Sequence, residues 1–161
     1  MMHIEVATRS EVGQRSHNED DLRHGTSGQQ VYAIVSDGAG GHSNGAMASD
    51  IVVRTATVLL QRATVFNAAV LEAAIEEANE VLNMGQHGFT SQQRMHATVV
   101  ALWIDAELGE AMWAHVGDSR LYRVRQGRAE QLTMDDSVVP HMAHAGYIKP
   151  EEAKHQPHKN Q

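Results

Sequence analysis

Acidic residues and glycines follow one short apolar run, and this combination points to metal chemistry. Residues 31–35, Val-Tyr-Ala-Ile-Val, are typical of a buried strand, and the glycine-rich stretch 36–41 follows directly. Hard divalent cations prefer oxygen ligands and accept backbone carbonyls, so Asp37 and the carbonyl of Gly38 are candidate ligands. We expect the glycines to force a turn after the strand. Taken alone, the pattern fits an ordinary Asp-Gly turn better.

Two further segments place carboxylates beside basic residues. In residues 15–20, Arg-Ser-His-Asn-Glu-Asp, the adjacent acids Glu19 and Asp20 follow Arg15, whose planar guanidinium suits bidentate binding of phosphate. In residues 115–120, His-Val-Gly-Asp-Ser-Arg, Asp118 lies at a Gly-Asp turn between two expected strands. Each segment also has a plainer interpretation. Residues 15–20 could be a solvated charged strand or loop, and Asp118 could be an ordinary hairpin-turn residue. A fourth segment, 132–137, fits the N-terminus of a helix, with Asp136 and Ser137 near its cap.

The composition narrows the classes of function. The chain has 161 residues, 42% of them hydrophobic, which suits one globular domain. Its net charge of −7 argues against a nucleic-acid partner, and the absence of cysteine excludes disulfides and thiolate metal sites. We see no signal peptide and no apolar stretch long enough to cross a membrane, so we expect a cytoplasmic protein without a membrane partner. The motifs HExxH, GxGxxG and GK[ST] are absent, so the sequence does not support a zinc hydrolase or a nucleotide-binding glycine loop.

The elements that must position these residues follow from hydrophobic periodicity. Apolar positions at helical spacing predict two helices, over residues 44–62 and 67–84, joined as an antiparallel pair. Alternation predicts a first strand over residues 2–8. After Asp135 we expect the chain to become helical again, over residues 138–145. Strands are expected over 98–104, 111–116, 121–125 and 129–133. Strands, a helix pair and a run of meandering strands make up an α+β fold, with helices packed on a mostly antiparallel sheet.

Weak signals taken one at a time become specific in combination. The chain contains five motifs in this order: R-x-x-N-E-D, S-D-G-x-G-G-H, A-T, H-V-G-D-S-R-x-Y and L-T-x-D-x-S. In these motifs and their order it resembles the type 2C family of metal-dependent Ser/Thr protein phosphatases, and the spacing between the motifs is similar to that of the bacterial members. The resemblance runs from Val12 to the end of the chain. It implies an antiparallel β-sandwich flanked by helix pairs, a single phosphatase domain over residues 1–161, and a flap-like helical segment over residues 136–155.

The resemblance also implies roles for individual residues. Asp37 would bridge two ions, Mn²⁺ or Mg²⁺, while Glu19 and the Gly38 carbonyl would complete one site. Asp20 would support the cluster through waters, and Asp118 would help to hold a weaker third ion. Arg15 would bind the substrate phosphate. Thr98 and Tyr122 are expected as core or scaffold positions, and His42 as the start of the first helix and not a ligand.

The implied reaction is hydrolysis of phosphoserine and phosphothreonine in a protein substrate of a Ser/Thr kinase. Water shared by two cations loses its proton near neutral pH and attacks phosphorus in line, without a covalent intermediate. Arg15 and the metals would stabilise charge on the phosphoryl oxygens.

Three departures from the family pattern matter. The family continues into further strands with two more ligand aspartates, whereas this sequence stops at Gln161, so we expect an incomplete metal site and weak or no activity from residues 1–161 alone. Some eukaryotic members place a histidine proposed as general acid directly after the D-G pair. Ala39 stands at that position here, so the leaving-group proton is expected from water. Asp136 replaces the histidine of the family's L-T-x-D-H-S.

Two other functions compete with the protein phosphatase. One is a catalytically incomplete fragment or regulatory binding module of the same fold. The other is a hydrolase of small phosphates, although nothing in the sequence builds a specific small-molecule pocket. The intact set of Arg15, Glu19, Asp20, Asp37 and Asp118 favours the enzyme, because a binding module has no chemical need for it.

Overall fold

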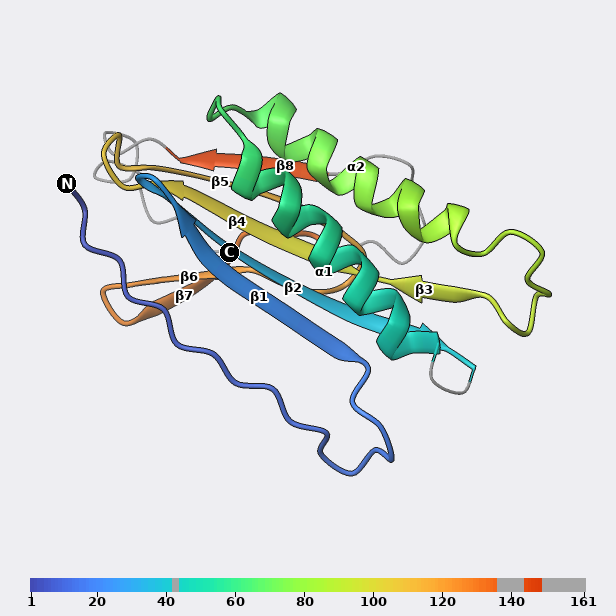
Figure 1. Ribbon diagram of the computed structural model, residues 1–161. Coiled ribbons are helices and arrows are strands. Elements are labelled where there is room, and N and C mark those ends of the chain that lie inside the picture. Colours follow the sequence, from blue (N-terminus) through green and yellow to red (C-terminus); the bar gives the residue numbers. More distant parts are fainter. Residues whose placement is uncertain (42–43, 136–143, 149–161) are drawn as a thin grey trace.

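One mixed α and β unit is seen in the computed structural model, which describes residues 1–41, 44–135 and 144–148 (Figure 1). These residues contain two helices, α1 (Asn44–Arg62) and α2 (Ala68–Met84). The strands are β1 (Asp20–Ser27), β2 (Gln30–Gly40), β3 (Met95–Ala97), β4 (Val99–Asp105), β5 (Glu110–Val116), β6 (Tyr122–Arg125), β7 (Arg128–Gln131) and β8 (His144–Ile148).

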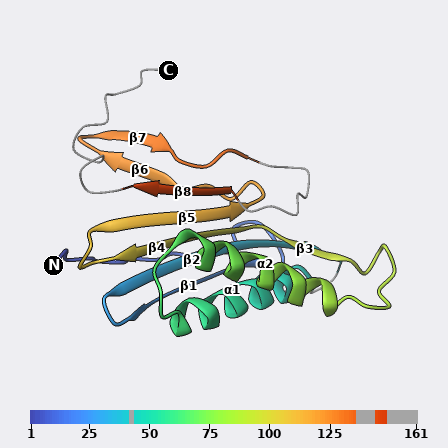
Figure 2. The same cartoon turned by 90° about the horizontal axis from the view of Figure 1, so that it is seen from above.

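The strands form an antiparallel sheet of six and a separate hairpin. The order in the main sheet is β1-β2-β4-β5-β8, with β3 pairing to β2 beyond the end of β4. The helices cover one face of this sheet, and the β6–β7 hairpin lies on the other side (Figure 2). The expected α+β class with an antiparallel sheet and a helix pair is confirmed. Of the expected sandwich, the described residues supply the six-stranded sheet and this two-stranded one.

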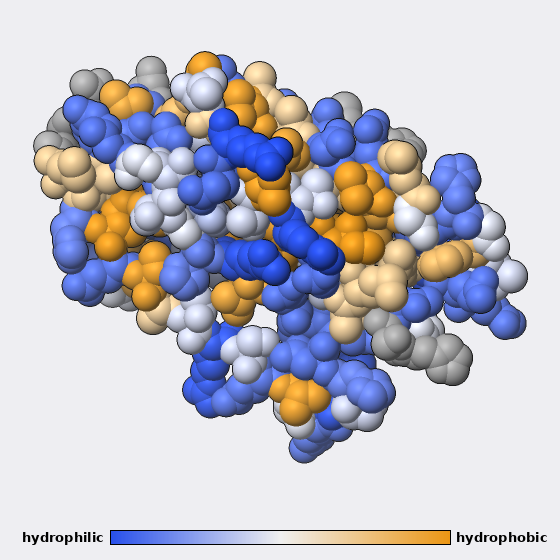
Figure 3. Space-filling model, in the orientation of Figure 1, coloured by the Kyte–Doolittle hydropathy of each residue, from blue (hydrophilic) through white to orange (hydrophobic). Residues whose placement is uncertain are grey.

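The core lies between the helix pair and the sheet. The buried positions of both helices recur every three or four residues, as the apolar periodicity predicts. From the sheet, Ile34, Ala101 and Trp103 meet them with no exposed surface. The outer surface over α1 and α2 carries separate apolar spots broken up by hydrophilic side chains (Figure 3). Within the described residues, neither helix is long and apolar enough to cross a membrane.

Both helices begin and end close to the expected residues. α1 spans Asn44–Arg62, as predicted. α2 begins one residue later than predicted, because Asn67 is its N-cap and accepts a hydrogen bond from Val70 N at 2.9 Å. Beyond α2, the side chain of Gln86 donates to the carbonyl of Met95 and accepts from its N–H, both at 2.9 Å. These two bonds fix the start of β3.

Three expectations about secondary structure are wrong. Residues 2–8 form no strand: Met2 N donates to Ala106 O at 2.8 Å, yet Val6 stays 41% exposed, so the alternation buries no face. The glycines after Ser36 do not end the strand, because β2 continues through Gly40 and pairs with β3. The helix expected over 138–145 does not extend over its last two positions, which belong to β8.

The β8 strand pairs with β5, for example Trp113 with Gly146, and so gives hydrogen-bond partners to an otherwise open edge. Glycine also disfavours a helix there. The same strand contradicts the helical assignment for 144–148 within the flap-like segment 136–155. Residues 136–143 and 149–155 of that segment lie outside the described residues, as do His42, Asp136 and Ser137.

Candidate metal and phosphate site

Asp37 lies inside β2 and not at a turn. Asp20, the first residue of β1, is its direct partner in the register, so both side chains leave the same face of the sheet. This is the face opposite the helices, because the neighbouring residues Ser36 and Gly38 are buried on the helix side. The strand pairing therefore brings together two carboxylates that are seventeen positions apart in the sequence.

The electrostatics of Asp37 show how crowded these carboxylates are. Partial burial, a side-chain hydrogen bond with Asp20, and the negative charges of Asp20, Asp118 and Glu19 all raise the pKa of Asp37 above its ordinary value. Each cause disfavours the ionised form. A cation among these groups would reverse the effect, so the cluster has the electrostatic character of a cation site.

Glu19 is held differently from the two aspartates. Its backbone carbonyl accepts from Gly38 N at 3.0 Å and from the buried hydroxyl of Ser49 at 2.6 Å. Its carboxylate packs over Gly45 in the first turn of α1, where a Cβ would stand 2.5 Å from Glu19 Cδ. The helix dipole favours negative charge at this end. Glu19 therefore faces the helix side, within electrostatic range of Asp37 but turned away from the Asp20–Asp37 pair.

The glycines at this end of β2 allow the helix to approach closely. A Cβ on Gly38 would lie 1.8 Å from Gly45 O and 2.9 Å from Glu19 O, distances that no side chain can adopt. Sequence reasoning interpreted Gly38 as an exposed carbonyl at a turn. The structure shows a buried strand residue against which α1 starts.

Thr98 links the Asp37 strand to the turn that carries Asp118. Asp37 N donates to Thr98 Oγ1 at 3.0 Å, and Thr98 N donates to Asp37 O at 2.9 Å. Thr98 Oγ1 also hydrogen-bonds the hydroxyl of Ser119. Gly117 adopts a φ of +96°, and a Cβ there would come within 2.7 Å of Thr98 Cγ2. The scaffold role expected for Thr98 is confirmed, and sequence reasoning missed its partner Ser119, although Ser119 stands inside the V-G-D-S-R motif.

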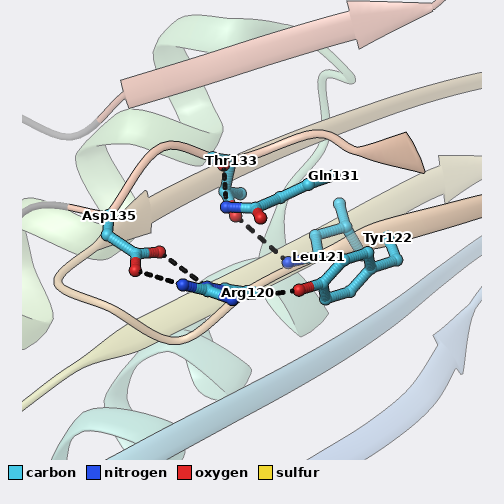
Figure 4. Close-up of polar contacts among 6 residues, drawn as sticks. All are labelled: Arg120, Leu121, Tyr122, Gln131, Thr133 and Asp135. Carbon is cyan, nitrogen blue, oxygen red and sulfur yellow. Dashed lines mark hydrogen bonds and ion pairs between the residues drawn. The ribbon is translucent and has the colours of Figure 1, made fainter. Parts of the chain in front are cut away.

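A second network follows the Asp118 turn (Figure 4). Arg120 donates two hydrogen bonds to Asp135, from Nε at 2.8 Å and from Nη2 at 2.6 Å, and a third to the Tyr122 hydroxyl at 3.2 Å. The hydrogen bonds from Arg120 hold the pKa of Asp135 below its usual range. Leu121 N donates to Thr133 Oγ1 at 3.2 Å. Tyr122 is 49% exposed, so it is no core residue, and it belongs to the scaffold through Arg120.

Arg15 lies in the loop before β1, on an open pocket. The pocket has a volume of about 300 Å³ and is lined by Arg15, Ser16, His17 and Glu19. The expected phosphate ligand and one expected metal ligand thus share one hollow, and Arg15 is exposed to solvent.

The predicted residues therefore form two adjoining groups. The charges of Asp20, Asp118 and Glu19 act on Asp37, and Glu19 also lines the pocket with Arg15. The donor set is all oxygen, which fits Mg²⁺ or Mn²⁺. Over residues 1–41, 44–135 and 144–148, no three side chains of His, Asp or Glu converge closely enough to hold one ion. The donor chemistry fits a divalent cation, whereas the side chains do not form a closed cage.

Known proteins with this pattern are phosphatases. The family model described as Protein phosphatase 2C matches residues 8–151. Protein phosphatase PhpP of Streptococcus pneumoniae is 31% identical over 98% of this chain and 65% of its own length. Serine/threonine phosphatase stp of Listeria innocua is 33% identical over 99% of this chain and 64% of its own length. The chain thus spans about two thirds of these relatives, slightly less in each case.

Solved structures agree with the sequence comparison. The catalytic domain of the serine threonine protein phosphatase PstP, in complex with two manganese ions, matches with a TM-score of 0.69 and 29% identity, over 80% of this chain and 54% of that one. The Streptococcus agalactiae serine/threonine phosphatase matches with a TM-score of 0.67 and 28% identity, over 79% and 54%.

Proposed function

Because the chain belongs to the protein phosphatase 2C family, we propose that it is a metal-dependent protein phosphatase acting on phosphoserine and phosphothreonine, with residues 1–161 forming one domain. The observation that carries the proposal is the carboxylate cluster around Asp37, beside the Arg15 pocket; burial and the neighbouring carboxylates together raise the pKa of Asp37. Kinase-phosphorylated proteins as substrates, a role in signal transduction and a cytoplasmic location belong to the same proposal.

The residues would divide the work as follows. Asp20, Asp37 and Asp118 offer carboxylate oxygens from β1, β2 and the turn after β5, respectively. The Gly38 carbonyl and Glu19 offer further oxygens. Bound Mn²⁺ or Mg²⁺, two ions and a weaker third, would supply Lewis acidity toward water and phosphate. Arg15 would hold and orient the phosphoryl oxygens through bidentate hydrogen bonds.

A calorimetric titration of Mn²⁺ tests the metal site. We expect the wild-type chain to bind Mn²⁺, and we expect Asp37→Ala to lower the affinity for Mn²⁺ by at least about tenfold. Glu76→Gln is the matched control, because it removes one negative charge from the exposed side of α2, away from the site. We expect at most weak Mn²⁺-dependent release of phosphate from a phosphothreonine peptide by residues 1–161. Any release should be lost in Asp37→Ala and kept in Glu76→Gln. Metal affinity that is equal in all three proteins would refute the proposal.

A binding module that keeps the fold without turnover is the second candidate. One observation favours it: within the described residues, no three acidic or histidine side chains converge on a single point. The same experiment separates the two, because a binding module would bind the phosphopeptide through Arg15 without releasing phosphate.

A further inference from the structure

His96 occupies a place on the sheet that the proposed reaction can use. It lies in β3, directly opposite Ala39 of β2 in the antiparallel register. Residues directly opposite each other project from the same face, and Ala39 shares its face with Asp37, two positions before it. The imidazole therefore leaves the sheet on the face of Asp37 and Asp20. It is exposed to solvent there.

The backbone around His96 is firmly placed. Its neighbour Met95 is 1% exposed on the helix side, and both backbone polar groups of Met95 are bound by the side chain of Gln86 at 2.9 Å. On the other side, Thr98 is hydrogen-bonded to the backbone of Asp37. With the strand fixed on both sides, His96 has no freedom to turn to the helix side.

The spacing suits a phosphoryl group between the two side chains. Asp37 and His96 are diagonal neighbours on adjacent strands, because Thr98 stands beside Asp37 and His96 is two positions further along. Diagonal neighbours in an antiparallel pair lie about 7–8 Å apart. That distance is too long for a direct hydrogen bond, and it leaves room for a phosphate ester with one side toward Asp37 and the other toward His96.

The reaction creates a need for a proton donor at this position. When the P–O bond of a phosphoserine or phosphothreonine breaks, the alkoxide is a strong base and leaves readily only if it is protonated. With a divalent cation bound, the carboxylates of Asp20 and Asp37 would be ionised. Ionised carboxylates accept hydrogen bonds but cannot donate them, so both residues are unsuited to the task. Histidine is the side chain that most often acts as a general acid.

We propose that His96 is the general acid of this site, an inference that rests on the proposed phosphatase function. Its imidazolium donates a proton to the serine or threonine oxygen as the bond from that oxygen to phosphorus breaks. The bond from the attacking water to phosphorus forms at the same time. The attacking water releases one proton to solvent, and the neutral imidazole takes up one proton from solvent. Protons and charge therefore balance over the cycle. Under this proposal His96 supplies the leaving-group proton, in place of the water that the sequence led us to expect.

Leaving-group chemistry gives the sharpest kinetic test. His96→Gln should lower kcat for a phosphothreonine peptide by about 10²-fold or more. It should lower kcat for p-nitrophenyl phosphate far less, because nitrophenolate is a weak base that departs without a proton. His24→Gln, at an exposed position further along β1, is the matched control and should change neither rate. Equal losses on both substrates, or no loss on either, would overturn the assignment.

A binding measurement without turnover completes the test. With Mg²⁺ present, inorganic phosphate should shift the imidazole NMR resonances of His96, identified by their loss in His96→Gln, and leave those of His24 in place. If calorimetry shows phosphate binding while the His96 resonances stay fixed, the general-acid role is refuted and the phosphatase proposal stands. If the wild-type chain binds no phosphate, the phosphatase proposal fails and the role of His96 falls with it.

Discussion

Replacing Thr98 by valine isolates the hydroxyl that joins Asp37 to the Asp118 turn. Valine keeps the methyl group that packs on Gly117, so the change removes hydrogen bonds without opening a cavity. It leaves Asp37 N and the Ser119 hydroxyl without their partner at Thr98 Oγ1. Loss of one partner of a buried polar group costs about 1–3 kcal/mol. Thr98 is only half-buried and water replaces part of the loss, so we expect a decrease in unfolding free energy of about 1–2 kcal/mol.

Urea unfolding measures this change, and Thr57→Val is its matched control. With a slope of about 2 kcal/mol per molar urea, in the middle of the range for small domains, the midpoint of Thr98→Val should drop by about 0.5–1 M. The Thr57 hydroxyl is buried on α1 and has no hydrogen-bond partner among the described residues, so Thr57→Val should be neutral or stabilising. Mn²⁺ affinity should fall for Thr98→Val alone. Equal midpoints for the two variants would refute the reasoning, as would unchanged Mn²⁺ affinity in Thr98→Val.

Two further predictions concern the end of β2. Gly38→Ala should lower the unfolding free energy by at least about 3 kcal/mol or prevent folding, because its Cβ would stand 1.8 Å from Gly45 O. Gly85→Ala is the control, because the nearest atom to its Cβ is 3.5 Å away, and this variant should melt at or above the wild-type temperature. A wild-type melting temperature for Gly38→Ala would contradict the close contact. Since the pKa of Asp37 is raised in the folded chain, its contribution to stability is full below the unfolded pKa of about 3.9 and is lost as pH rises through the folded pKa. Metal-free Asp37→Asn should therefore be more stable than wild type in urea at pH 7, with the difference vanishing near pH 3; a difference independent of pH would exclude this cause.

The sequence predicted most of the elements, because periodicity reports burial. Both helices are confirmed nearly residue for residue, and each begins where a hydrophobic stripe and a capping or glycine signal coincide. Residues 2–8 show why alternation is a weaker signal: a strand also needs a partner with free hydrogen-bonding groups, and one sequence segment does not reveal its partner. The helix predicted over the first residues of β8 was wrong for the same reason, because β8 is defined by its pairing with β5.

The motifs identified the site residues but could not show on which face each one lies. Glu19 and Asp20 are adjacent in sequence, and strand geometry sends one toward the helices and the other toward Asp37. Gly38 was interpreted as a turn residue because glycine density is locally ambiguous between a turn and a close helix contact. The site roles of Arg15, Glu19, Asp20, Asp37, Gly38 and Asp118 stay predictions until metal and phosphate binding are measured.

The contact between Gly38 and Gly45 has a mechanical consequence. With no side chain between them, the backbones of Gly38 and Gly45 touch directly, so the end of β2 and the first turn of α1 cannot shift independently. α1 is 19 residues long, or about 28 Å at 1.5 Å per residue. A small displacement at the carboxylates would therefore move α1 as a rigid body. The C-terminal end of α1, at Gln61, is hydrogen-bonded to Ser27 and Tyr32 at the opposite end of the sheet, so the movement would reach that end.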